Sequence, residues 1–197
     1  MNDSAPDDHE LLAAVVRGEA DALDTWYRRE HPVVHRLCAG FLADVAEADD
    51  AAQDALLRLL DGLPRWEAER SWARWRNTVV LNHCRDRLRR RAARRSAEDA
   101  SVRAALPAAL PAPDDVAAAR EVRAVLMAAL ASLSPREREV FVLRDLQDED
   151  TADVAAALGI GESSVRSLLA LAHRRLRRVL QERAPGLVPV AAARSAP

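Results

Sequence analysis

The sequence contains no lysine, little glycine and few aromatic residues. All 29 basic residues among the 197 are arginine, six residues are glycine, and aromatic residues make up 4%. Alanine is abundant by contrast, and 49% of the residues are hydrophobic. This composition favours helices and argues against β-sandwiches, β-barrels and glycine-rich phosphate-binding loops. We therefore expect an all-α protein.

Long apolar runs and a cysteine framework are missing as well. No run approaches the roughly 20 apolar residues that a membrane-spanning helix needs. The first ten residues, MNDSAPDDHE, are acidic and do not resemble a signal peptide. Cys38 and Cys84 have no CxxC spacing, which argues against a disulfide scaffold or a cysteine zinc site. We expect a cytoplasmic protein without a membrane partner.

The charge is unevenly distributed, although the formal net charge is only −2. Residues 1–62 carry five arginines against 14 acidic residues, a net charge of −9. Residues 63–95 carry 11 arginines against three acidic residues, a net charge of +8. Such separation predicts two surfaces for two unlike partners.

Helical patterns cover most of the chain. They span residues 8–17, residues 19 onward past Pro32, residues 46–60, residues 71–95 and residues 114–132. We expect Pro32 to kink or restart its helix. Residues 96–113 contain three prolines that forbid a continuous helix, so we expect a flexible Ala/Pro-rich linker. The pattern predicts separate folding units at residues 1–95 and 114–183, followed by a disordered tail at residues 184–197.

The clearest local signals lie between residues 134 and 180. The run SPRE at residues 134–137 provides a helix N-cap, a proline at the first helical position and the glutamate of a capping box. A second cap at Asp150 precedes a short helix that Gly159 ends. Gly159, Ile160 and Gly161 form a turn before a helix that begins at Glu162. This spacing predicts a helix-turn-helix.

The last helix has two unlike faces at about 100° per residue. Its apolar face contains Val165, Leu168, Leu169, Ala172, Leu176, Val179 and Leu180. Its other face contains Arg166, Ala170, His173, Arg174 and Arg177. One face can pack in a core while the other reaches phosphates and base edges. The alternative is a solvated helix of an ordinary bundle.

Together these motifs resemble the sigma-70 family of bacterial transcription initiation factors, and most of all its small two-domain class, the extracytoplasmic-function (ECF) sigma factors. The resemblance covers roughly residues 8–182. Residues 49–59 (DDAAQDALLRL) are similar to the family's core-polymerase-binding helix. Residues 72–75 (WARW), Asn82 and residues 86–90 (DRLRR) are similar to its promoter-melting segment. Residues 133–140 (LSPREREV) and the helix-turn-helix match the domain that reads the upstream promoter element.

The resemblance implies a sigma factor that directs core RNA polymerase to promoters and helps to melt DNA, not an enzyme. Its partners would be the β′ and β subunits of core RNA polymerase, promoter DNA and, as is frequent in this class, an anti-sigma factor. No cofactor or small-molecule substrate is implied. Residues 1–95 would bind polymerase and the −10 element, and residues 114–183 would bind the −35 element.

Three groups of site residues follow. The polymerase-binding group is Asp49, Asp50, Gln53, Asp54, Leu57 and Arg58, a polar surface with an apolar centre that is also compatible with a merely solvated face. The −10 group is Arg65, Arg70, Trp72, Trp75, Asn82, Arg85, Arg89 and Arg90, in which the tryptophans either stack on unpaired bases or pack in the core. The −35 group is Glu162, Ser163, Ser164, Arg166, Ser167, His173, Arg174 and Arg177.

The last helix departs from the family pattern. Two usual arginines are Leu168 and Leu171, the usual histidine is Ala170, and His173 replaces a further arginine. Fewer phosphate contacts predict weaker and less salt-dependent binding by this domain.

Two alternatives stay open at this point. One is a helix-turn-helix regulator of the response-regulator output type, although the strand runs of a receiver domain are missing. The other is a helical enzyme or scaffold that binds no DNA, although no catalytic constellation is visible. The five histidines are scattered, and His31 and His35 lack a third ligand, so we expect no metal site.

Overall fold

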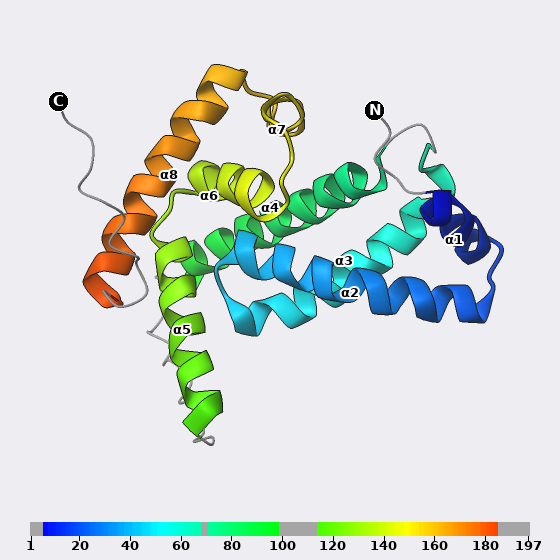
Figure 1. The fold of residues 1–197 in the computed structure, drawn as a ribbon, viewed down its shortest axis with the longest axis horizontal. Coiled ribbons are helices and arrows are strands. Elements are labelled where there is room, and N and C mark those ends of the chain that lie inside the picture. The colour runs from blue at the N-terminus through cyan, green and yellow to red at the C-terminus, as the bar shows by residue number, and fades with distance from the viewer. Residues whose placement is uncertain (1–5, 68–70, 99–113, 185–197) are drawn as a thin grey trace.

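The computed structural model describes residues 6–67, 71–98 and 114–184, and these residues form helices without a strand. The helices are α1 (Pro6–Val16), α2 (Ala20–Leu42), α3 (Val45–Gly62), the 3-10 turn η1 (Leu63–Arg65), α4 (Trp72–Glu98), α5 (Asp114–Ala131), α6 (Pro135–Phe141), the π-helical turn η2 (Val142–Leu146), α7 (Thr151–Leu158) and α8 (Glu162–Arg183) (Figure 1). The predicted all-α class is confirmed.

Local capping explains where the helices of the second half begin and end. The Ser134 hydroxyl accepts a hydrogen bond from the Glu137 amide at 3.3 Å, and the Glu137 carboxylate accepts one from the Ser134 amide at 2.8 Å. This is the predicted capping box. The Asp150 carboxylate accepts a hydrogen bond from the Asp153 amide at 2.9 Å and so begins α7. Gly159 ends α7 with a φ of 65°, a left-handed conformation that glycine adopts without strain. The predicted helix-turn-helix is thereby confirmed.

Two predicted helices can be compared with their observed bounds. Pro32 lies inside α2, which continues through it over 23 residues, so the helix does not restart there, while the predicted kink stays a prediction. The ring lies on the exposed side of the helix, while Glu30, Val34 and Leu37 are buried around it, so packing holds the helix together despite the lost backbone hydrogen bond. The helix α4 runs to Glu98, three residues past its predicted end.

The first domain is a bundle in which α2, α3 and α4 contact one another and α1 lies against α2 (Figure 1). Its core contains Leu37, Leu59 and Val80, all with at most 1% of their surface exposed. The thiols of Cys38 and Cys84 are both free and buried in this core. A hydrogen bond with the Cys38 thiol, together with burial, raises the pKa of Cys84 well above its ordinary value. Two such thiols behave as inert core residues.

The second domain consists of α5, α6, η2, α7 and α8. The helix α8 contacts α5, α6 and α7, and a small buried cluster joins Leu130 and Leu133 to Ala172 and Leu176. The predicted apolar face of the last helix is confirmed, because Val165, Ala172 and Leu176 are buried on it.

The two domains lie against each other. One continuous buried cluster contains residues of the first domain, such as Leu37 and Leu81, together with Val142, Val154 and Val165 of the second. Separate folding of the two halves stays a prediction. Residues 99–113, which make up most of the predicted linker, and residues 185–197 of the predicted tail lie outside the described residues.

Within the described ranges no individual helix is long and apolar enough to cross a membrane; α7 and α8 pass that test only as a pair, bent by 99°.

Candidate polymerase and DNA interfaces

The outer face of α3 presents all six residues of the predicted polymerase-binding group. Asp49, Asp50, Gln53, Asp54, Leu57 and Arg58 are exposed. The opposite face is buried through four alanines and two leucines, which fixes the orientation of the helix. Leu57 is the most exposed large apolar side chain of the described residues, at 65%. A leucine surrounded by carboxylates at this exposure suits a protein partner.

Two carboxylates of this surface are oriented by basic groups of neighbouring helices. The His35 Nε2 lies 2.9 Å from an Asp49 oxygen, and the Arg87 guanidinium donates to Asp54 at 2.9 Å. His83 lies beneath Asp54, with its ring buried and its Nε2 4.0 Å from the Asp54 carboxylate. Burial, reinforced by nearby Arg58, lowers the pKa of His83, so this imidazole is neutral near pH 7.

The tryptophans of the predicted −10 group divide into two roles. Trp72 is 2% exposed and contacts three other tryptophans, with ring centroids 6.4, 5.7 and 5.1 Å away. Its indole N–H donates to the buried Glu30 carboxylate at 2.9 Å. Of the two roles that the sequence left open for Trp72, the structure supports core packing, because the residue is 2% exposed and leaves no ring face open to DNA. Trp75 is half-buried.

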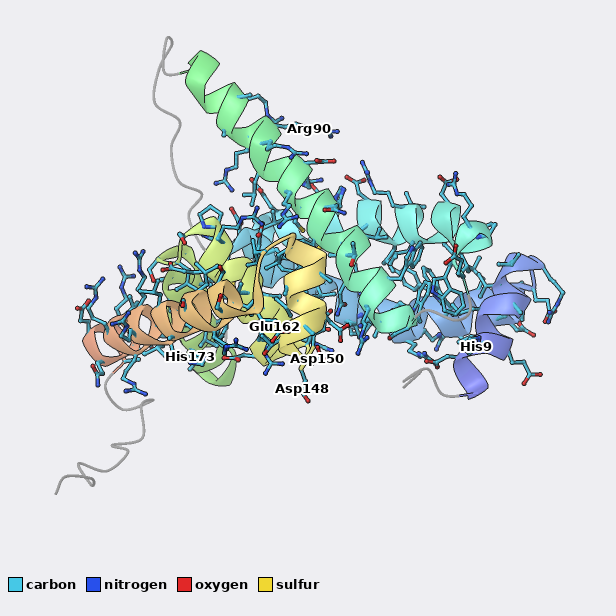
Figure 2. All side chains as sticks on the ribbon, turned by 90° about the horizontal axis from the view of Figure 1, so that it is seen from above. His9, Arg90, Asp148, Asp150, Glu162 and His173 are labelled. Atoms are coloured by element: carbon cyan, nitrogen blue, oxygen red, sulfur yellow. The ribbon has the colours of Figure 1, made fainter. Side chains whose placement is uncertain are left out.

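The exposed face of α4 carries Asn82, Arg89 and Arg90. Figure 2 shows Arg90 on the part of α4 that extends beyond the helices beside it. Arg65 is exposed in η1 and donates to the Asp61 carbonyl at 3.1 Å, while Arg70 lies outside the described residues. Arg85 differs from the others: its guanidinium makes two hydrogen bonds, of 2.6 and 2.7 Å, to the carboxylate of Glu139 in α6.

Part of the arginine run of α4 turns away from solvent and pairs with α3. Arg87 contacts Asp54, and Arg91 contacts Asp44 at 3.3 Å and Glu47 at 3.0 Å. These two arginines lie four residues apart, on the side that carries buried Cys84. They hold the two helices together. Helical periodicity could have placed Arg87 and Arg91 on the side of buried Cys84, but a count of the segment's net charge does not distinguish them from the exposed arginines.

The predicted −35 group lies along the exposed side of α8. Glu162, Ser163, Ser164, Arg166, Ser167, His173, Arg174 and Arg177 are all exposed. Figure 2 shows Glu162 at the start of the helix and His173 farther along it. Arg166 contacts Glu162 one turn earlier at 3.2 Å. His173 is held by Asp145 and meets the Phe141 ring edge-on at 6.1 Å, so it also joins α8 to the preceding segment.

A buried chain of polar groups crosses from the first domain to the second, and sequence reasoning did not find it. Glu30 accepts a hydrogen bond from Arg76 at 3.2 Å, Arg76 donates to Asn77 at 3.1 Å, and Asn77 donates to Glu149 at 2.6 Å. Burial raises the pKa of Glu149, an effect that the Asn77 hydrogen bond opposes. Glu30 and Arg76 lie 46 residues apart, and Asn77 and Glu149 lie 72 residues apart, so no local sequence pattern predicts these hydrogen bonds.

An apolar groove of about 520 Å³ opens between α2, α5, η2 and α8. Its lining includes Gly40, Leu126, Met127 and Leu130. The charged or titratable side chains that line it, His35, Arg36 and Arg123, are basic. Elsewhere in the described residues, no group of three or more histidines, cysteines or carboxylates could hold a metal ion.

The match to known families covers both halves of the chain. Residues 26–94 match Sigma-70 region 2, and residues 123–176 match Sigma-70, region 4. The ECF RNA polymerase sigma factor SigM of Mycobacterium tuberculosis is 36% identical over 173 residues, which cover 88% of this chain and 84% of SigM. SigL of the same organism, also an ECF RNA polymerase sigma factor, is 31% identical over 178 residues, covering 87% of this chain and 96% of SigL.

Two solved structures share the fold. The sigma factor RpoE from Bartonella quintana, in complex with the anti-sigma factor NepR, has a TM-score of 0.64 at 20% identity, covering 81% of this chain and 96% of that one. CnrH, in complex with the cytosolic domain of CnrY, has a TM-score of 0.64 at 22% identity, covering 89% of this chain and 97% of that one. With regions 2 and 4 both matched and relatives similar over nearly their full length, the chain belongs to the ECF sigma factors of the sigma-70 family, non-enzymatic proteins of transcription initiation.

Proposed function

We propose that the outer face of α3 binds core RNA polymerase through its β′ and β subunits, in the cytoplasm. The observation that carries this proposal is the exposure of all six predicted residues on one side of one helix, centred on Leu57. Protein interfaces join such an apolar centre to a polar rim. His35 and Arg87 support the surface by orienting its carboxylates.

We further propose that α4 and the segment before it bind the −10 element. Asn82, Arg85 and Arg89 are spaced by three and four residues, so they share one side of α4. Arginine and asparagine side chains can hold phosphates and the edges of unpaired bases. Arg65 in η1 and Arg90 on α4 are also exposed and add to the basic charge of this domain.

The upstream −35 element is the proposed ligand of α8. In a helix-turn-helix the first turns of the second helix enter the major groove. Here those turns present Glu162, Ser163 and Arg166 to solvent, while the opposite side is buried against α6 and α7. Arg174 and Arg177 lie farther along α8, where they suit contacts to the DNA backbone.

An anti-sigma factor is the partner that we propose for the apolar groove. Its basic rim of His35, Arg36 and Arg123 favours an amphipathic helix with acidic flanks. Leu126 is 45% exposed at this groove, so a charge there should not disturb the fold. In cells that hold the protein inactive, Leu126→Glu should raise transcription from its promoters, whereas Val16→Glu, at an exposed position outside the groove, should not. Equal activity of both variants would contradict this site.

Reconstitution tests the polymerase and DNA assignments together. The purified chain is mixed with core RNA polymerase, and transcription start sites are mapped on genomic DNA of the source organism. Substitutions on α3 should weaken holoenzyme formation, whereas Asn82→Ala and Arg89→Ala should preserve it and reduce open-complex formation. If the α3 variants assemble normally, or the α4 variants fail to assemble, the proposed division of roles is wrong.

A further inference from the structure

The contact between the two domains is both apolar and polar, and it uses a residue of the proposed −10 surface. On the apolar side, α2 approaches η2 so closely that a Cβ atom added at Gly40 would lie 3.0 Å from Val142 Cγ2. Val142 is completely buried in the cluster that includes α2 and α4. A side chain at position 40 would therefore require Val142 to shift by a few tenths of an ångström.

In the ion pairs of this contact, arginines of the first domain bind carboxylates of the second. Arg85 of α4 binds the carboxylate of Glu139 through two hydrogen bonds, and Arg74 binds Asp153 of α7 at 2.5 Å. Asn77, between these arginines on α4, donates to Glu149 at 2.6 Å. In these three contacts the first domain supplies the donors and the second supplies the carboxylates. Arg138 of α6 donates in the opposite direction, to the Phe41 carbonyl at 3.2 Å. Hydrogen bonds to Glu139 raise the pKa of Arg85, as expected for a well-formed pair.

A carboxylate that accepts two hydrogen bonds from an arginine occupies the same donors as a DNA phosphate would. Arg85 cannot offer the same two N–H groups to Glu139 and to a DNA phosphate at once. We propose that the chain alone adopts a closed state that inhibits its own DNA binding. In this state Glu139 occupies the Arg85 donors that a DNA phosphate would bind, and DNA competes with the second domain for this arginine. This inference rests on the proposed DNA role of Arg85.

A reversible covalent lock tests the closed state. In Gly40→Cys/Val142→Cys, the sulfur at position 142 would replace a Val142 Cγ, about 3 Å from the Cβ of position 40, which suits an S–S bond of about 2.05 Å. Oxidised glutathione is the oxidant: the two thiols lose two protons and two electrons to form one S–S bond, and the glutathione disulfide becomes two thiols. Dithiothreitol reverses the reaction. The two single-cysteine variants show whether buried Cys38 or Cys84 contributes.

Binding is measured by fluorescence anisotropy with a labelled pool of random single-stranded DNA. Locking should weaken binding by about tenfold, the loss expected for one charge-assisted contact, and dithiothreitol should restore it. In the Arg85→Ala background, locking should have no further effect. An unaltered affinity on locking, or an equal loss with and without Arg85, would overturn the proposal.

A second variant avoids engineered cysteines. Glu139→Gln removes the charge that holds Arg85, so the full-length chain should bind the same DNA pool several-fold more tightly. Arg136→Ala is the matched control, because Arg136 is the other partner of Glu139, at 3.1 Å, and its loss leaves the Arg85 pair in place. If Glu139→Gln does not raise the affinity, self-inhibition is wrong. If Arg85→Ala leaves the DNA affinity of the unlocked chain unchanged, the proposed DNA role of Arg85 is wrong. Disulfide formation between positions 40 and 142 would then still show that the two domains lie against each other.

Discussion

Leu57 offers the sharpest test of the polymerase surface, because its substitution should separate binding from folding. The residue is 65% exposed at the centre of the outer α3 face. Burial of a whole leucine side chain contributes about 1.5–3 kcal/mol. With about two-thirds of the residue available to a partner, the contribution to binding is about 1–2 kcal/mol. Leu57→Ala retains one carbon of the side chain, so we expect a loss of about 1 kcal/mol, or about fivefold in affinity.

The assay is a titration of core RNA polymerase against the fluorescently labelled chain, accompanied by thermal unfolding of each variant. The free energy of unfolding should change by less than about 0.5 kcal/mol, because little of Leu57 is buried. Leu23→Ala on α2 is the matched control, since Leu23 is 42% exposed and lies outside the proposed surface. Parental affinity of Leu57→Ala, or an equal loss in Leu23→Ala, would refute the reasoning.

Three further predictions concern the same surfaces and the domain contact. Asp50→Arg combined with Gln53→Arg should weaken core binding in a pull-down while leaving the melting temperature unchanged, because both side chains are exposed. Arg166→Ala should alter which upstream sequences the holoenzyme prefers, by about 1–3 kcal/mol, whereas Arg174→Ala should weaken all sequences alike and reduce the salt slope by about 1; a randomised upstream element at several salt concentrations distinguishes the two results. Burial raises the pKa of Glu149 above its ordinary 4.5, so the folded chain binds the proton of the Glu149 carboxyl more tightly than the unfolded chain does. The contribution of this carboxyl to stability is therefore lost as pH rises through the raised pKa. Glu149→Gln should remove that loss, and denaturant unfolding of both proteins across pH 4–8 should show the variant gaining stability relative to the parent with rising pH; a constant difference would contradict the assignment.

Features that depend on neighbouring residues could be read from the sequence. The capping box at Ser134, the N-cap at Asp150, the left-handed glycine and the turn of the helix-turn-helix use partners within a few residues, and all are present where expected. The exposure of the α3 carboxylates and of Arg166 follows from helical periodicity, because the apolar residues of each helix must face the core. The resemblance to the ECF sigma factors depended on the order of these same local motifs.

Tertiary structure alone decided which polar and aromatic side chains were available to a partner. Trp72 and Arg85 carry the residue types of a DNA surface, yet one is bound to Glu30, 42 residues away, and the other to Glu139, 54 residues away. Pro32 locally favours a kink or a restart of its helix, but α2 continues through it, with Glu30, Val34 and Leu37 buried around it. Arginine and tryptophan suit a buried hydrogen bond and a nucleic-acid contact equally well, because the same N–H groups and ring faces serve both. Only the packing of α2, α4 and α6 against one another selects between these uses.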